Sequence, residues 1–193
     1  MKHCTYPIDM QIDKLKSKCE KFGINVPENF YEKINLYVQS IIEHNPTFGL
    51  IGAGEIENIY QRHIADSLSI LLFSDIDNLY ILDFGSGGGL PGMVLAIARP
   101  QAKFILAESS QKKSQFLQLC VDTLGLKNVN IYPGRAKNIF EKFDVITLRA
   151  TGPLTRTISQ SIKLLRQPGK LALWAGEKIY SKIDYWKNFG LNF

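Results

Sequence analysis

Cysteine is scarce in this sequence, and the three that occur are far apart, at positions 4, 19 and 120. No two form a CxxC pair, so neither a disulfide framework nor a zinc site is indicated, and this usage is typical of a reducing compartment. Long apolar runs are also missing, since stretches such as Ile70–Phe73 are far shorter than the roughly 20 residues of a membrane span. Residues 1–10 contain no apolar leader segment. We therefore expect a cytoplasmic protein with no membrane partner and no metal.

Acidic residues are fewer than basic ones, 18 against 23, which gives a formal net charge of +5. The excess is concentrated in residues 103–142, where seven cations face three acids. The seven cations are Lys103, Lys112, Lys113, Lys127, Arg135, Lys137 and Lys142. A basic segment of this kind favours a polyanionic partner.

The first 75 residues have the periodicity of helices. Apolar side chains recur at spacings of three and four over Ile8–Phe22, over about Glu28 to Pro46, and over about Gly54 to Phe73. Gly23 interrupts the first pattern, and the Asn45-Pro46 pair is expected to end the second. We therefore predict a helical N-terminal cap region over residues 1–75.

From Leu79 onwards, short apolar runs alternate with helical segments, which is typical of parallel α/β units. The predicted strands are 79–84, 103–108, 128–133, 143–149 and 170–176, and the last is preceded by a turn at Pro168-Gly169. Residues 76–193 are predicted to form a doubly wound, Rossmann-like core that makes one structural unit with the cap region. Beyond Gly176 the pattern allows one further helix and the start of a strand.

The stretch "LDFGSGGGLPG" concentrates glycine directly after the first predicted strand. Read from Gly87 to Gly92 it fits G-x-G-x-x-G, the dinucleotide fingerprint. Read from Asp83 to Gly89 it gives acid-x-G-x-G-x-G, which resembles the first motif of methyltransferases that use S-adenosylmethionine (SAM). Asp83 favours SAM, because a carboxylate repels a pyrophosphate and attracts an ammonium group. Glu108, at the end of the second strand, is placed to bind ribose hydroxyls of either ligand.

Two missing motifs restrict the methyl acceptor. No cysteine stands near the end of the fourth or fifth strand, as methylation of a pyrimidine carbon requires. The fourth strand is followed by "RATGP" and not by the Asn/Asp-Pro-Pro-Tyr associated with amino-group methylation. An acceptor that is already nucleophilic, such as guanine N7, needs only to be aligned with the methyl group.

Three polar residues are candidates for the catalytic group. Arg149 ends the fourth strand, where it could bind the acceptor base or a phosphate, or equally pair with a nearby acid. His63 falls near the apolar stripe of its predicted helix, which favours a packed histidine. If that helix caps the carboxyl edge of the sheet, Arg62 and His63 lie beside the opening of the cofactor site and can contact RNA phosphate.

The segments "RHIADSL", "LDFGSGGGLPGMVLAIARP", "ESSQKKSQFL" and "FDVITLRA" resemble the bacterial RsmG family, also called GidB, over about residues 45–178. The resemblance implies SAM-dependent methylation of guanine N7 in the 530 loop of 16S ribosomal RNA, with that RNA or the small ribosomal subunit as partner. A monomer is expected.

The resemblance also implies roles for individual residues. Those implied or predicted for the cofactor are Asp83, Gly85, Gly87, Gly89, Leu90, Glu108, Ala136, Lys137 and Arg149. Lys137 stands where the family usually has an acid. Those for RNA are Arg62, Lys112, Lys113, Arg135 and Lys137, through phosphate contacts that are blind to sequence.

Three other functions are consistent with parts of this pattern. A dinucleotide-dependent oxidoreductase would share the glycine loop, although no Tyr-x-x-x-Lys is present. A small-molecule methyltransferase would need no basic rim. A non-catalytic RNA-binding module would keep a loop shaped for a cofactor without using it.

Overall fold

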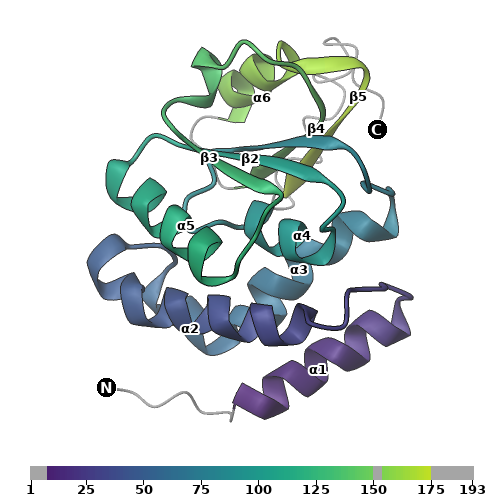
Figure 1. Ribbon diagram of the computed structural model, residues 1–193, viewed down its shortest axis with the longest axis vertical. Coiled ribbons are helices and arrows are strands. Elements are labelled where there is room, and N and C mark those ends of the chain that lie inside the picture. Colours follow the sequence, from purple (N-terminus) through teal and green to yellow (C-terminus); the bar gives the residue numbers. More distant parts are fainter. Residues whose placement is uncertain (1–7, 150–153, 175–193) are drawn as a thin grey trace.

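The computed structural model describes residues 8–149 and 154–174. Its centre is a five-stranded sheet in the order β3-β2-β1-β4-β5, and every neighbouring pair is parallel (Figure 1). The strands are β1 (Tyr80–Phe84), β2 (Lys103–Glu108), β3 (Val129–Pro133), β4 (Phe143–Arg149) and β5 (Leu165–Trp174). The predicted Rossmann-like sheet is confirmed. Its strand order reverses between β1 and β4, so a ligand crevice is expected at their carboxyl ends.

Helices cover the sheet unequally. The α-helices are α1 (Ile8–Lys21), α2 (Phe30–Phe48), α3 (Ala65–Ser67), α4 (Gly92–Ala98), α5 (Gln111–Thr123) and α6 (Leu154–Ile162). On one face α4 and α5 lie between the sheet and α2, whereas α6 covers the other face near β4 and β5 (Figure 1). The short 3-10 helix η4 (Ala136–Asn138) follows β3. The larger core cluster joins N-terminal residues such as Tyr37 to sheet and helix residues such as Ile81 and Leu117.

The second helix continues two residues beyond the predicted end at Pro46. A proline in the last turn removes one backbone donor without stopping the helix. The helix ends at Gly49, which has φ +58° and donates its N–H to the carbonyl of Asn45 at 2.9 Å. The Asn45 side chain accepts the N–H groups of Leu50 and Ile51, at 2.7 and 2.9 Å, so the termination is made by polar bonds and not by the proline.

The predicted continuous helix over Gly54–Phe73 is wrong. The structure has a 3-10 turn (η1, Ala53–Asn58), a π-helical turn (η2, Tyr60–Ile64), the single turn α3, and a second 3-10 turn (η3, Leu68–Leu72). The reason is competition for backbone carbonyls: Ser67 Oγ donates to the His63 carbonyl at 2.6 Å, and the Arg149 guanidinium donates to the Arg62 carbonyl at 3.1 Å. Changes of pitch make such carbonyls available to side chains.

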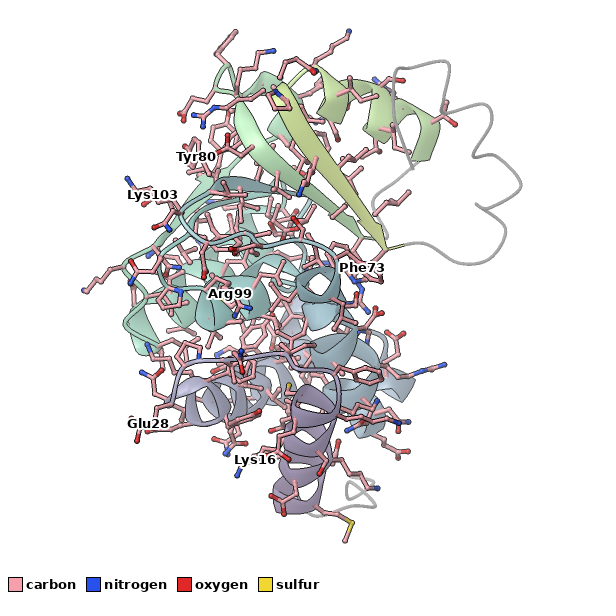
Figure 2. The ribbon with its side chains drawn as sticks, turned by 90° about the vertical axis from the view of Figure 1, so that its right-hand side faces the viewer. Lys16, Glu28, Phe73, Tyr80, Arg99 and Lys103 are labelled. Atoms are coloured by element: carbon pink, nitrogen blue, oxygen red, sulfur yellow. The ribbon has the colours of Figure 1, made fainter. Side chains whose placement is uncertain are left out.

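Strand β5 begins five residues before the predicted start at Lys170. Phe143 pairs with Leu165, but Val145 pairs with Lys170, so the predicted Pro168-Gly169 turn lies inside the strand as a bulge. Trp174 Nε1 donates to the Asp66 carbonyl at 2.7 Å, and Phe73 lies beside the end of β5 (Figure 2). The end of β5 is thereby joined to the N-terminal region. The helix and strand predicted beyond Gly176 lie outside the described residues.

Candidate cofactor site

The glycine loop joins β1 to α4 and has a conformation that requires glycine. Gly85, Gly87 and Gly89 have φ values of +80°, +57° and +98°. The N–H groups of Gly85 and Ser86 both donate to the carbonyl of Ala107 in β2, at 2.9 and 3.0 Å. The loop is therefore held over the carboxyl ends of β1 and β2.

The underside of the loop rests on the N-terminal helices. Tyr37 of α2 is fully buried and donates its hydroxyl to the Gly88 carbonyl at 2.6 Å. A Cβ added to Gly89 would lie 2.7 Å from that hydroxyl oxygen, and one added to Gly88 would lie 3.1 Å from Leu50 Cβ. Sequence reasoning missed Tyr37. The available signal was a tyrosine in an apolar stripe, whose hydroxyl needs a partner when it is buried.

The upper side of the loop is open beside Glu108. A Cβ added to Gly87 would meet nothing within 4 Å. The Gly87 N–H donates to one oxygen of Glu108 at 2.8 Å, and the Ser110 N–H donates to the other at 2.7 Å. Glu108 is 9% exposed, and these two bonds orient its carboxylate at the loop. Each oxygen retains a further lone pair, so this carboxylate can still accept a hydrogen bond from a ribose hydroxyl.

Asp83 lies beneath the same loop and is only 1% exposed. One carboxylate oxygen accepts the Thr147 hydroxyl at 2.6 Å, and the other accepts the N–H of Gly92, the first residue of α4, at 3.3 Å. A Cβ on Gly92 would lie 2.6 Å from that second oxygen, so glycine permits this approach. Burial raises the pKa of Asp83, and the bonds to Thr147, Ser86 and Gly92 oppose the rise. The ammonium contact of Asp83 stays a prediction.

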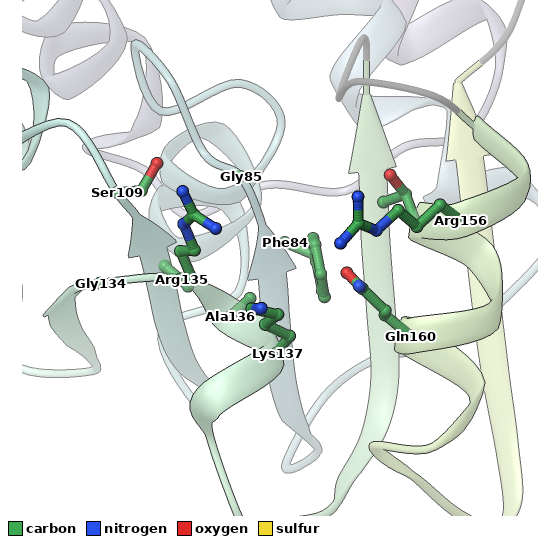
Figure 3. A pocket seen from close by; sticks show the side chains of 11 residues that line it. Phe84, Gly85, Ser109, Gly134, Arg135, Ala136, Lys137, Arg156 and Gln160 are labelled. Atoms are coloured by element: carbon green, nitrogen blue, oxygen red, sulfur yellow. The ribbon is translucent and has the colours of Figure 1, made fainter.

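A pocket of about 350 Å³ opens at the carboxyl ends of β1 and β2, towards η4 and α6 (Figure 3). Its lining contains four of the predicted residues, namely Gly85, Arg135, Ala136 and Lys137. Sequence reasoning missed the other seven lining residues. Three of them belong to α6, and the full set is Phe84, Ala107, Ser109, Gly134, Arg156, Thr157 and Gln160. No motif marks the α6 residues. Leu90 is buried outside this lining, and Lys112 and Lys113 lie in the first turn of α5.

Arg149 reaches from β4 into the N-terminal region. Its Nη2 lies 3.1 Å from an Asp66 carboxylate oxygen and 2.9 Å from His63 Nδ1, and its Nη1 lies 3.3 Å from Ser67 Oγ. The side chain is 16% exposed. The sequence left two interpretations of Arg149 open, and these bonds favour the one in which it pairs with a nearby acid. Contact with a cofactor or an acceptor base stays a prediction, and the side chain of Arg62 is exposed beside this group.

We expect Arg149→Ala to lower the free energy of unfolding by about 1–3 kcal/mol, because Asp66 and His63 lose their cationic partner. Asp66→Asn, the matched control, should cost no more than about 1 kcal/mol, because that carboxylate is half-exposed. Urea unfolding measures both. Turnover of Arg149→Ala, assayed where it is fully folded, tests the catalytic role separately. An alanine variant as stable as the wild type would contradict the ion-pair interpretation.

His63 is 7% exposed, as a packed histidine would be. Burial, and next the Arg149 guanidinium, lower its pKa, and the Glu55 and Asp66 carboxylates oppose this. The folded protein therefore binds fewer protons than the unfolded chain, in which His63 titrates near 6.5. The stabilisation is complete above that pH and is lost as the pH falls through the lower, folded-state pKa.

We accordingly expect the urea midpoint of the wild type to fall between about pH 7 and pH 5, partly through His63. His63→Gln removes the titrating group and should reduce this pH dependence. Unfolding curves at several pH values measure the difference. An identical pH profile for the two proteins would show that His63 does not carry the effect.

Within residues 8–149 and 154–174, no group of three or more histidine, cysteine, aspartate or glutamate side chains is arranged to hold a metal ion. Across the same residues, no helix is both long and apolar enough to span a membrane.

Solved structures similar to this one share its fold. A precorrin-6y C5,15-methyltransferase from Geobacter metallireducens GS-15 has a TM-score of 0.53 at 18% identity, and the match covers 73% of each chain. M. jannaschii TYW2, solved in complex with AdoMet, has a TM-score of 0.55 at 17% identity over 67% of this chain and 61% of that one.

Curated relatives are closer in sequence. The ribosomal RNA small subunit methyltransferase G of Brachyspira hyodysenteriae is 40% identical over 163 residues, which are 83% of this chain and 79% of the relative. The protein of the same name from Mycoplasma capricolum is 34% identical over 88% of this chain and 74% of its own length. The family model described as "GidB: rRNA small subunit methyltransferase G" matches residues 30–187. The chain therefore belongs to the GidB family, the family of rRNA small subunit methyltransferase G.

Proposed function

We propose that this protein is a SAM-dependent methyltransferase that acts on 16S ribosomal RNA and methylates N7 of a guanine in the 530 loop. The observation that carries the proposal is the glycine loop, supported below by Tyr37 and open above at Gly87, with the Glu108 carboxylate fixed at its side. Family membership supplies the reaction class and the RNA.

The residues in and around the loop fit two parts of SAM, the ribose and the amino-acid chain. Glu108 can accept a ribose hydroxyl, and the open side of Gly87 leaves room for the chain that carries the sulfonium. Asp83 supplies negative charge beneath the loop for an ammonium group. When SAM is bound, it supplies a methyl group activated by positive sulfur.

Methylation of guanine N7 requires few catalytic groups from the protein. Guanine N7 has an in-plane lone pair and no proton, so alignment is sufficient and no general base is needed. The surroundings of His63 agree with this, because its side chain is buried and its Nδ1 already lies 2.9 Å from Arg149 Nη2. Arg149 and His63 would then hold the N-terminal segment around residues 62–67 in place beside the site. The side chain of Arg62 would be available for RNA phosphate. We further propose that the protein works in the cytoplasm as a monomer.

The decisive experiment maps N7-methylguanine in 16S ribosomal RNA from cells with and without the gene. We expect one modified guanine, in the 530 loop, to be lost with the gene and restored by purified protein with SAM. Calorimetric titration with SAM and with NADH provides the second readout. Binding of NADH but not SAM would overturn the proposal in favour of an oxidoreductase, and RNA binding without methyl transfer would favour a non-catalytic module.

A further inference from the structure

The pocket between η4 and α6 has an apolar inner wall and a cationic rim. The inner wall is formed by Phe84, Gly85, Ala107 and Ala136, of which the two alanines are buried. The rim consists of Arg135, Lys137 and Arg156, all exposed, and none of the described residues that line the pocket is acidic. Figure 3 shows Arg135 and Lys137 on one side and Arg156 with Gln160 on the other, with Phe84 between them.

The two rim arginines differ from most other arginines in the described part of the chain. Arg99, Arg149 and Arg166 each pair with a carboxylate, at 3.4, 3.1 and 2.9 Å. Among residues 8–149 and 154–174, neither Arg135 nor Arg156 has an ion pair with a carboxylate. Among the described residues, cationic side chains that have no ion pair with a carboxylate are thus gathered at the mouth of this pocket.

The cofactor of the proposed function does not account for this charge. The adenosine part of SAM is neutral. The amino-acid half carries a sulfonium, an ammonium and one carboxylate, but the proposed function places that half at Gly87 and Asp83, which do not line this pocket. A phosphodiester, in contrast, matches the fork of an arginine side chain and gains from several cations at once. The rim therefore suits a polyanion that crosses the pocket mouth outside the cofactor.

We infer that Arg135, Lys137 and Arg156 form an RNA-backbone clamp across the mouth of the cofactor pocket, in which Arg156 of α6 supplies the side opposite η4. The inference rests on the proposed function, because it assumes that the inner wall holds the adenosine of SAM. A phosphate lies between the two arms of the clamp, and Gln160 is available to a neighbouring sugar or base. Bound RNA then covers the cofactor.

The test compares Arg156→Ala with Lys163→Ala, which removes an equal charge from an exposed residue just beyond α6 that does not line the pocket. The probe is a single-stranded RNA oligonucleotide with the sequence of the 530 loop, titrated at several salt concentrations. For Arg156→Ala the magnitude of the slope of log K against log salt should fall by about 0.7, the loss of one phosphate contact with a single strand. Lys163→Ala should keep the wild-type slope, and SAM affinity should change by less than about twofold in both variants.

Two results would overturn the clamp. The first is an unchanged RNA slope in Arg156→Ala, and the second is a tenfold loss of SAM affinity, which would assign the arginine to the cofactor. Titration with ADP separates RNA from a free nucleotide: tight ADP binding that depends on Arg156 would identify a small-molecule site and exclude the clamp. Methyl transfer by the wild type is measured in parallel, so a protein that shows the predicted slope but transfers no methyl would contradict the proposed function alone.

Discussion

Replacing Asp83 with asparagine should abolish most of the affinity for SAM while leaving the fold intact. Asparagine keeps the shape and can still accept a hydrogen bond from Thr147 or Gly92, but it cannot attract an ammonium group. Loss of one charge-assisted bond of about 1.5–3 kcal/mol corresponds to roughly a 10- to 150-fold weaker complex. Calorimetric titration of wild type and Asp83→Asn measures it.

The stability of Asp83→Asn should equal or exceed that of the wild type near neutral pH. Because burial raises the pKa of this acid, the folded protein binds more protons than the unfolded chain, and the contribution of Asp83 to stability is lost as the pH rises through the folded-state pKa. Asparagine has no charge to bury. Asp83→Ala is the comparison, and it should cost about 1–3 kcal/mol because Thr147 and the Gly92 N–H lose their acceptor. Wild-type SAM affinity in Asp83→Asn would show that the carboxylate is only structural.

Alanine at Gly89 should destabilise the protein far more than alanine at Gly87. Both residues have positive φ, but a Cβ at Gly89 would lie 2.7 Å from the Tyr37 hydroxyl and 3.0 Å from Leu117 Cδ2, both buried. We expect Gly89→Ala to cost about 3 kcal/mol or more, from strain and overpacking together. Thermal and urea unfolding measure the loss.

Gly87→Ala is the matched control for this pair. Its Cβ would enter open space, so only the backbone strain of about 1–2 kcal/mol is expected. If that space belongs to the cofactor, SAM affinity should fall about tenfold or more, a cost of the size expected for displacing a packed group. If the two alanine variants were equally destabilised, Tyr37 would not be what supports the loop. If Gly87→Ala bound SAM as tightly as the wild type, SAM would not occupy the open space beside Gly87.

The sequence predicts well those features that repeat locally. The sequence predicts all five strands because each contains a short apolar run, although only β1, β2 and β4 are buried along most of their length. The stretch "LDFGSGGGLPG" marks the β1–α4 loop because positive φ favours glycine. Gly125, with φ +60°, similarly lies just beyond the end of α5 at Thr123. Such signals depend only on residues that are close together in the chain, so they can be found in a single sequence.

Contacts between distant segments could not be predicted in the same way. The π-helical turn at Tyr60–Ile64 depends on Arg149, more than 80 residues later, and the early start of β5 depends on a bulge against β4. Tyr37 and Arg156 belong to helices whose role at the site is visible only after the sheet has brought them to one edge. The apolar stripe around Tyr37 indicates that its hydroxyl needs a partner but not which one, and no motif marks Arg156.

The hydrogen bond from Tyr37 to Gly88 has a consequence for the order in which the protein is made. Translation produces α2 before residues 85–92, so the surface that receives the loop is already outside the ribosome when the loop emerges. The residue that supports the loop is therefore synthesised about fifty residues before the loop itself.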